Sequence, residues 1–239
     1  MTRLDVLVTK GGFAESRERA QALILAGKVR VAGETVRRPD RSVSDDAPIS
    51  VESAPDYASR GALKLAPALE RFGVDPAGRV CADIGASTGG FTDVLLRRGA
   101  ARVYAIDVGR GLLHWRLRQD PRVAVIERLN ARDLDSFPEP IELVVIDVSF
   151  IGLEKVLPAV RRAAPHAEVV ALFKPQFEVG REEVGKGGIV RDPQAVEGAL
   201  RRLREWCEGN GYGVRAEAPS ELKGAEGNQE IFLHLVARR

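Results

Sequence analysis

Downstream of Arg60, short apolar runs alternate with stretches in which apolar residues recur every three or four positions. Short apolar runs are typical of buried strands, and the longer spacing is typical of amphipathic helices. The predicted strands are Val80–Ile84, Val103–Asp107, Val123–Glu127, Leu143–Asp147, Val169–Phe173, Tyr212–Ala216 and Ile231–Val236. The predicted helices are Ala62–Arg71, Phe91–Arg98, Leu112–Arg118, Leu153–Ala163 and Gln194–Cys207. This alternation predicts an α/β fold with a parallel, doubly wound, Rossmann-like sheet.

Residues 1–53 follow a different pattern, which predicts a small α+β domain. The predicted helices are residues 2–11 and 17–26, and the predicted strands are residues 28–31, 36–39, 42–43 and 49–51. Thr2 is a residue type that favours the N-cap position, so it is expected to cap the first helix. Residues 54–60 have the composition of a linker, and the large domain is therefore expected to span residues 61–239.

The composition is that of an ordinary globular protein, with a formal net charge of +2 over 239 residues. There is no signal-peptide pattern and no run of roughly 18 apolar residues. Cys81 and Cys207 lack the spacing of metal ligands, and the three histidines are scattered along the chain. We therefore expect a cytoplasmic protein without a membrane segment, a disulfide or a metal site.

A glycine-rich turn follows the first predicted strand of the large domain. Its spacing is D-x-G-x-x-x-G, whereas dinucleotide-binding enzymes carry G-x-G-x-x-G to cradle a pyrophosphate. The difference favours S-adenosylmethionine (SAM), whose amino-acid end has no phosphate, and disfavours a nucleotide-dependent oxidoreductase. The residues expected to bind SAM here are Asp83, Gly85, Ser87, Gly89, Gly90 and Phe91. Asp83 would hold the turn or the SAM amino group, with help from the backbone of Gly85 and Ser87.

Two further acidic residues follow the next two predicted strands. Asp107 ends the second strand, where an acidic side chain can accept hydrogen bonds from ribose hydroxyls. Asp133 follows the third strand and could contact the adenine amino group. Because ligands of doubly wound sheets bind at the carboxyl ends of strands, both residues are candidate SAM ligands.

Two features that other methyltransferases need are missing from the sequence, and their absence narrows the choice of methyl acceptor. Amino-group methyltransferases often carry an Asn/Asp-Pro-Pro-aromatic motif after the fourth strand, but this chain has Asp147-Val148-Ser149-Phe150. Methylation of pyrimidine C5 needs a cysteine nucleophile, and neither cysteine lies at a useful strand end. A hydroxyl acceptor remains, and it needs help to lose its proton.

Charged residues at unusual places could supply that help. Lys174 follows an apolar strand, Lys64 lies in an apolar helical stretch, and Glu230 heads the last strand. A free lysine has a pKa near 10.4, but burial and a nearby cation lower it. Our hypothesis is that Lys174 takes or polarises the hydroxyl proton. Lys64, beside Lys174, would tune the basicity of Lys174. Asp147 and Glu230 would orient the lysines and the hydroxyl.

The first 41 residues are locally basic, with nine Lys and Arg residues against five Asp and Glu residues, a net charge of +4. This charge fits contact with the phosphates of RNA, although an ordinary solvated face would look similar. The candidate RNA-binding residues are Arg3, Arg17, Arg19, Lys28, Arg60 and Lys186. The last of these lies in a glycine-rich loop, residues 176–192, which is either an RNA-closing loop or an ordinary surface loop.

Two resemblances join these observations. The segments Arg17–Ile24 and Gly27–Glu34, with Pro39 and Val43, resemble an S-four-like RNA-binding domain. Lys64, Asp147, Lys174 and Glu230 match, in order, the K-D-K-E tetrad of FtsJ-like ribose 2′-O-methyltransferases. From end to end the chain resembles the TlyA family of ribosomal RNA methyltransferases, whose members are also labelled haemolysins. The resemblance implies SAM-dependent 2′-O-methylation of cytidine in ribosomal RNA, on one or both ribosomal subunits.

Two other classes of function stay open at this point. One is an RNA-binding protein that keeps the methyltransferase fold without catalysis, and the intact tetrad argues against it. The other is a membrane-lytic protein, as the haemolysin label suggests, but no amphipathic or apolar segment supports direct lysis. The oligomeric state is not indicated by the sequence.

Overall fold

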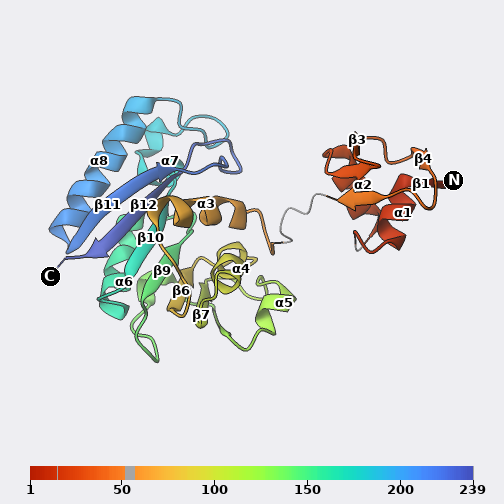
Figure 1. Ribbon diagram of the computed structural model, residues 1–239. Helices are drawn as coiled ribbons and strands as arrows, with labels where there is room; N and C mark the ends of the chain where they lie inside the picture. Colours follow the sequence, from red (N-terminus) through yellow and green to blue (C-terminus); the bar gives the residue numbers. More distant parts are fainter. Residues whose placement is uncertain (15, 52–56, 239) are drawn as a thin grey trace. The chain divides into compact units, whose positions relative to one another are not determined.

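The computed structural model describes residues 1–14, 16–51 and 57–238, and the chain divides into two compact units, Met1–Asp56 and Tyr57–Arg239 (Figure 1). Within the stretch expected to be a linker, residues 54–56 lie outside the described residues. Tyr57 to Arg60 belong to the second unit: the amide of Ala58 donates to Asp93 Oδ2 at 2.8 Å.

The first unit combines two helices with two small antiparallel sheets. Its elements are β1 (Thr2–Arg3), α1 (Leu4–Lys10), α2 (Arg17–Leu25), β2 (Val29–Val31), β3 (Glu34–Val36), β4 (Ser42–Val43) and β5 (Ile49–Val51). β1 pairs with β4, and the other sheet has the order β3-β2-β5. Its core comprises Leu4, Val8, Ala20, Ile24, Val29, Val36 and Val43.

Two predictions for this unit were wrong in detail. Thr2 does not cap the first helix, because it lies in β1 and α1 begins only at Leu4. The strand expected at residues 36–39 ends at Val36, since the hairpin partner of β2 starts earlier, at Glu34. Ala32 and Gly33 both have positive φ angles, +50° and +85°, which make a tight connection between β2 and β3.

A buried carboxylate holds α1 against α2. The Asp5 side chain is fully buried and accepts hydrogen bonds from Arg3, from Arg17 at 3.0 Å and from Gln21 at 2.8 Å. The guanidinium of Arg3 is the largest influence that lowers the Asp5 pKa below its usual value. Two of the arginines expected to bind RNA therefore also have a structural partner.

The Asp5 cluster predicts that the first unit is sensitive to acid. Because the folded-state pKa is lowered, its contribution to stability is complete above the unfolded-state value of about 3.9 and is lost as the pH falls below it. Asp5→Asn should lower the free energy of unfolding by about 1–3 kcal/mol near pH 7 and remove most of this acid sensitivity. Calorimetric unfolding of the whole protein between pH 7 and pH 3 measures both effects. An Asp5→Asn variant as acid-sensitive as the parent would contradict the assignment.

The second unit is a seven-stranded sheet covered by helices. Its strands are β6 (Val80–Ile84), β7 (Arg102–Asp107), β8 (Val123–Glu127), β9 (Leu143–Ile146), β10 (Glu168–Phe173), β11 (Tyr212–Pro219) and β12 (Ile231–Ala237), in the order β11-β12-β10-β9-β6-β7-β8. β6 to β10 are parallel, as predicted. β12 is antiparallel to both neighbours, because a loop rather than a crossover helix joins it to β11.

Helices cover both faces of this sheet. They are α3 (Ala62–Phe72), α4 (Gly90–Arg97), α5 (Trp115–Arg118), α6 (Leu157–Ala163), α7 (Pro175–Glu178) and α8 (Pro193–Gly209), with short 3₁₀ helices η1 (Ala131–Asp133), η2 (Leu153–Lys155) and η3 (Arg181–Glu183). α3 and α4 pack on one face, and α6 and α8 pack on the other. The α/β, doubly wound prediction is thereby confirmed.

Three helix predictions differ from the structure. The helix expected at Leu112–Arg118 shortens to α5, which begins only after His114. The helix expected at Leu153–Ala163 divides into η2 and α6, with Pro158 in the first turn of α6, where its missing N–H costs no helical hydrogen bond. α7 was not predicted at all.

The strand order reverses between β6 and β9, from which the chain proceeds toward opposite edges of the sheet. Ile84 and Ile146 pair at the ends of these two strands, so the residues that follow them meet at one place. Such a switch point forms the ligand crevice of open α/β sheets.

Candidate active site

The glycine turn after β6 allows two close approaches of backbone. Gly85 has a φ angle of +85°, and a Cβ atom there would lie 2.4 Å from the carbonyl oxygen of Asp147. Gly90 begins α4, and a Cβ atom there would lie 2.2 Å from Ser59 Oγ. Both positions need glycine because β9 and the start of α3 occupy the space of a side chain.

Asp83 lies beneath this turn and is fully buried. Its Oδ2 atom accepts hydrogen bonds from the amide of Thr92 at 2.8 Å and from the Thr92 hydroxyl at 2.6 Å, which join β6 to α4. Its Oδ1 atom is buried without a hydrogen-bond partner among the described residues. Burial raises the pKa of Asp83 to about 7. The open oxygen fits a further donor, such as the amino group of SAM.

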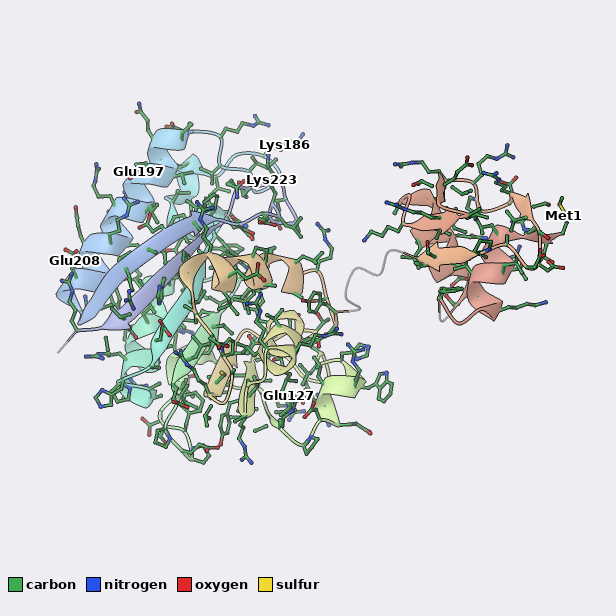
Figure 2. All side chains as sticks on the ribbon, in the orientation of Figure 1. Met1, Glu127, Lys186, Glu197, Glu208 and Lys223 are labelled. Atoms are coloured by element: carbon green, nitrogen blue, oxygen red, sulfur yellow. The ribbon has the colours of Figure 1, made fainter. Side chains whose placement is uncertain are left out.

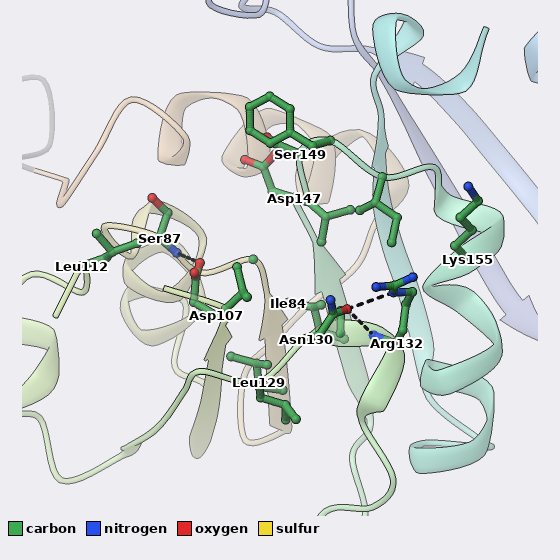
Figure 3. Close-up of a pocket in the computed structure, with 17 residues that line it drawn as sticks. Ile84, Ser87, Asp107, Leu112, Leu129, Asn130, Arg132, Asp147, Ser149 and Lys155 are labelled. Atoms are coloured by element: carbon green, nitrogen blue, oxygen red, sulfur yellow. Dashed lines mark hydrogen bonds between the residues drawn. The ribbon is translucent and has the colours of Figure 1, made fainter. Parts of the chain in front are cut away.

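Asp107 connects the end of β7 to the same turn. Its Oδ2 atom accepts a hydrogen bond from the Ser87 amide at 2.8 Å (Figure 3). Its Oδ1 atom accepts one from the Gly109 amide at 2.7 Å. A carboxylate can accept more than one hydrogen bond on each oxygen, so these contacts leave room for ribose hydroxyls. Ser87 has a φ angle of +48°, which the turn and this contact hold.

The main cavity has a volume of about 560 Å³ and opens at the carboxyl ends of β6, β7 and β9 (Figure 3). Its lining mixes apolar side chains with Asp107, Asp147 and Ser149. Asp133 is exposed and does not line the cavity, unlike its neighbours Asn130 and Arg132. The segment after β8 therefore reaches the cavity, but not through the carboxylate that the sequence suggested.

A second cavity of about 270 Å³ adjoins the first, because Gly85, Ser87 and Asp147 line both. Its walls bring the start of α3 and the loop between β11 and β12 to the glycine turn, with Arg60, Lys64 and Lys223 among the lining residues. Phe91 and Gly90 also line it, whereas Gly89 packs instead against Leu117.

The four candidate catalytic residues form two ion pairs. Lys64 Nζ lies 2.6 Å from Glu230 Oε2, and these side chains are 15% and 2% exposed. Lys174 Nζ lies 2.6 Å from Asp147 Oδ1. Each lysine is paired with one carboxylate, which is the arrangement that the expected orienting role of Asp147 and Glu230 needs. The pairing offsets the cost of removing both charges from water.

Ser149 is a site residue that the sequence reasoning missed. Its hydroxyl accepts a hydrogen bond from Lys174 Nζ at 2.9 Å. Lys174 is only 9% exposed, whereas Ser149 is exposed and lines the main cavity. Its place two residues after Asp147 was the available signal.

The candidate RNA-binding residues are dispersed over both units. Lys28 is partly exposed, Arg60 is exposed at the second cavity, and the side chain of Arg19 lies outside the described residues. Lys186 is exposed on the loop of residues 176–192 (Figure 2). Asn228 ties this loop to the β11–β12 connection, since its side chain donates to the carbonyl of Gly188 and accepts from the amide of Val190.

Together, the switch-point cavity, the glycine turn and the open oxygen of Asp83 define a SAM-dependent methyltransferase of the α/β class. Comparison with family models agrees: an FtsJ-like methyltransferase model matches residues 57–237, and an S4 domain model matches residues 2–49.

Individual relatives narrow the family. The chain is 50% identical to the 16S/23S rRNA (cytidine-2′-O)-methyltransferase TlyA of Mycobacterium tuberculosis, over 98% of this chain and 89% of that protein. A solved structure of a candidate hemolysin from Streptococcus thermophilus is 40% identical, with a TM-score of 0.76, over 99% of this chain and 88% of that one. The chain belongs to the TlyA family of FtsJ-like methyltransferases.

A more distant solved structure shows the shared fold alone. A candidate SAM-dependent methyltransferase from Listeria monocytogenes is 14% identical, with a TM-score of 0.55, over 75% of this chain and 100% of that one. Within residues 1–14, 16–51 and 57–238, no helix combines the length and apolarity that crossing a membrane requires.

Proposed function

We propose that this protein transfers the methyl group of SAM to the 2′-hydroxyl of a cytidine in ribosomal RNA. The observation that carries the proposal is the meeting of two largely buried lysine–carboxylate pairs with the glycine turn at a shared cavity edge. The acceptor class is supported by the name of the Mycobacterium tuberculosis relative. Because ribosomal RNA is the substrate, we place the protein in the cytoplasm.

Lys174 is the proposed acceptor of the hydroxyl proton. Its Nζ atom is held by Asp147 and Ser149, which line the main cavity, so its position beside these two residues is fixed before a substrate arrives. SAM, when bound, supplies an electrophilic methyl group on a sulfonium. As the neutral amine, after its ammonium proton has passed to solvent, Nζ would accept the proton of the 2′-hydroxyl. The ribose oxygen would gain its bond to the methyl carbon as the carbon–sulfur bond of the sulfonium breaks. Proton transfer to a positioned side chain contributes about 100- to 10,000-fold to a rate.

The second pair, Lys64 and Glu230, has a proposed electrostatic role. Lys64 lines the second cavity beside Asp147, where its ammonium group can steady negative charge that develops on the ribose oxygen. Glu230 is almost fully buried and holds that ammonium group at 2.6 Å. Glu230 therefore orients the Lys64 side chain.

For the cofactor, we propose that Asp83 Oδ1 receives the SAM amino group and that the turn from Gly85 to Phe91 surrounds the amino-acid end. Asp107 would receive the ribose hydroxyls. The exposed position of Asp133 favours Asn130 or nearby backbone as the adenine contact in its place. In the first unit, Arg19 and Lys28 are proposed to contact RNA phosphates, with Arg3 and Arg17 adding charge around Asp5.

The raised pKa of Asp83 predicts pH-dependent SAM binding. A cationic amino group favours the ionised carboxylate, so binding below pH 7 must release the Asp83 proton. The Kd for SAM should therefore weaken by up to about tenfold between pH 7 and pH 6. Calorimetric titration measures this change. 5′-Methylthioadenosine, which lacks the amino-acid end, should show no such dependence. Equal pH dependence of both ligands would contradict the contact.

Transfer of a labelled methyl group tests the proposed function as a whole. Purified protein is incubated with methyl-labelled SAM and with ribosomal subunits from cells that lack the enzyme. Label should appear in RNA and should resist alkaline hydrolysis at one internucleotide bond, because a 2′-O-methyl group blocks cleavage there. Absence of label in RNA would refute the proposal.

A further inference from the structure

The loop that follows β9, residues 148–153, runs beside α7, and three side-chain contacts connect them. Lys174, just before α7, contacts Ser149 at 2.9 Å. The rings of Phe150 and Phe177 lie 5.2 Å apart. At the far end, Glu178 Oε1 accepts a hydrogen bond from the amide of Leu153 at 2.8 Å. The loop is thus attached at both ends to the segment that carries Lys174.

This loop forms one wall of the main cavity. Val148, Ser149, Phe150 and Ile151 all line that cavity, next to Asp147 (Figure 3). Phe150 has a φ angle of +66° and is 91% exposed, so the loop holds a bulky residue in a conformation that only its surroundings can maintain. Contacts outside the cavity must therefore stabilise this wall.

Glu178, at the end of α7 four residues after Lys174, supplies such a contact. Burial raises the pKa of its carboxyl group to about 7, and the groups that face it are Glu154 and Lys155 of η2 and Cys207 of α8. A carboxyl group in such surroundings needs a donor, and the Leu153 amide is that donor.

Gly152 shows how closely the carboxyl group fits the loop. A Cβ atom at this position would lie 2.9 Å from Glu178 Oε2 and 3.4 Å from the carbonyl oxygen of Phe177. The φ angle of Gly152 is −74°, which any residue adopts. A side chain at residue 152 would therefore have to displace the carboxyl group of Glu178, whereas the backbone conformation does not itself call for glycine.

We propose that Glu178 is a positioning residue for the acceptor: it holds the loop of residues 148–153 in the conformation that receives the RNA nucleotide. The proposal rests on the proposed function, since it assigns the acceptor side of that site. Glu178 itself makes no hydrogen bond to the glycine turn, Asp83 or Asp107 among the described hydrogen bonds, although the loop that it holds lines the main cavity together with Asp107.

Two substitutions of Glu178 test this role. Glu178→Ala removes the acceptor of the Leu153 amide and should raise the KM for ribosomal RNA about tenfold. The Kd for SAM should change by less, because Asp83, Asp107 and the glycine turn keep their own contacts. Glu178→Gln keeps an oxygen for that amide and should restore the KM to near the parental value. A glutamine variant as impaired as the alanine variant, or an alanine variant with parental KM, would overturn the proposal.

Gly152→Ala tests the same contact from the other side, and it does so even if Glu178→Ala fails to fold. Its methyl group should displace the carboxyl group and raise the KM for RNA by a similar factor. Combined with Glu178→Ala it should add little, because both changes break one interaction. Fully additive effects would contradict the shared contact.

Glu183→Ala is the matched control. Glu183 is an exposed glutamate of η3 whose carboxylate accepts a hydrogen bond from the Gly180 amide at 2.7 Å. Its loss should leave the KM for RNA and the Kd for SAM unchanged. If the parental enzyme methylates no RNA, the proposed function fails; if it is active and Glu178→Ala matches it, only the role of Glu178 fails.

Discussion

Replacing Lys174 with alanine is expected to lower the rate of methyl transfer by at least about 100-fold, because the 2′-hydroxyl then loses its proton acceptor. Binding of SAM should be nearly unchanged, since Lys174 contacts Asp147 and Ser149 and is not one of the residues proposed to hold SAM. Single-turnover transfer to ribosomal RNA measures the first effect, and calorimetric titration with SAM measures the second.

Lys10→Ala serves as the control for this experiment, because Lys10 is an exposed lysine of the first unit. It should transfer methyl groups at the parental rate. Asp147 would be stranded by the loss of Lys174, so a thermal melt must show that the Lys174→Ala protein is folded. A folded variant with the parental rate would remove Lys174 from the mechanism.

The second large effect concerns the stability of the Lys64–Glu230 pair. Lys64→Met should lower the free energy of unfolding by about 3–5 kcal/mol, because it leaves the Glu230 carboxylate buried without a counter-ion. Combining it with Glu230→Leu removes both charges and should recover most of the stability. Methyl transfer should stay far below the parental rate in both variants, since neither contains the Lys64 ammonium group.

Chemical denaturation of the three proteins separates these expectations. If the two charges balance each other and Lys64 takes part in the reaction, the double variant regains the free energy of unfolding but not the rate of methyl transfer. A double variant as unstable as Lys64→Met would mean that the pair does not balance its own charges. A double variant that regains activity would mean that Lys64 has no part in the reaction.

The central strands of the sheet could be predicted from the sequence, because buried strands appear as short apolar runs. Val80–Ile84 and Val123–Glu127 have the predicted bounds. Lys174 was identified because it directly follows an apolar run, whereas Asp147 was assigned through the resemblance to the K-D-K-E tetrad. Residues at the ends of parallel strands converge by geometry, so their proximity follows from the fold class.

Features that depend on tertiary partners could not be predicted in this way. The antiparallel position of β12 depends on which strand edge is free, and the partner of each lysine depends on the packing of α3 beside β12. The structural role of Arg17 needed the position of Asp5 across the helix pair. Glu178 carried no local signal, since its partner Leu153 is a backbone amide.

The identity of the methylated nucleoside tests whether the protein methylates the 2′-hydroxyl of cytidine. Ribosomal RNA treated with the protein and SAM is digested completely to nucleosides and separated by chromatography with mass spectrometry. The proposed reaction predicts that 2′-O-methylcytidine is present in RNA treated with the parental protein and absent from RNA treated with Lys174→Ala. A methyl group on a base, or equal 2′-O-methylcytidine from both proteins, would contradict it.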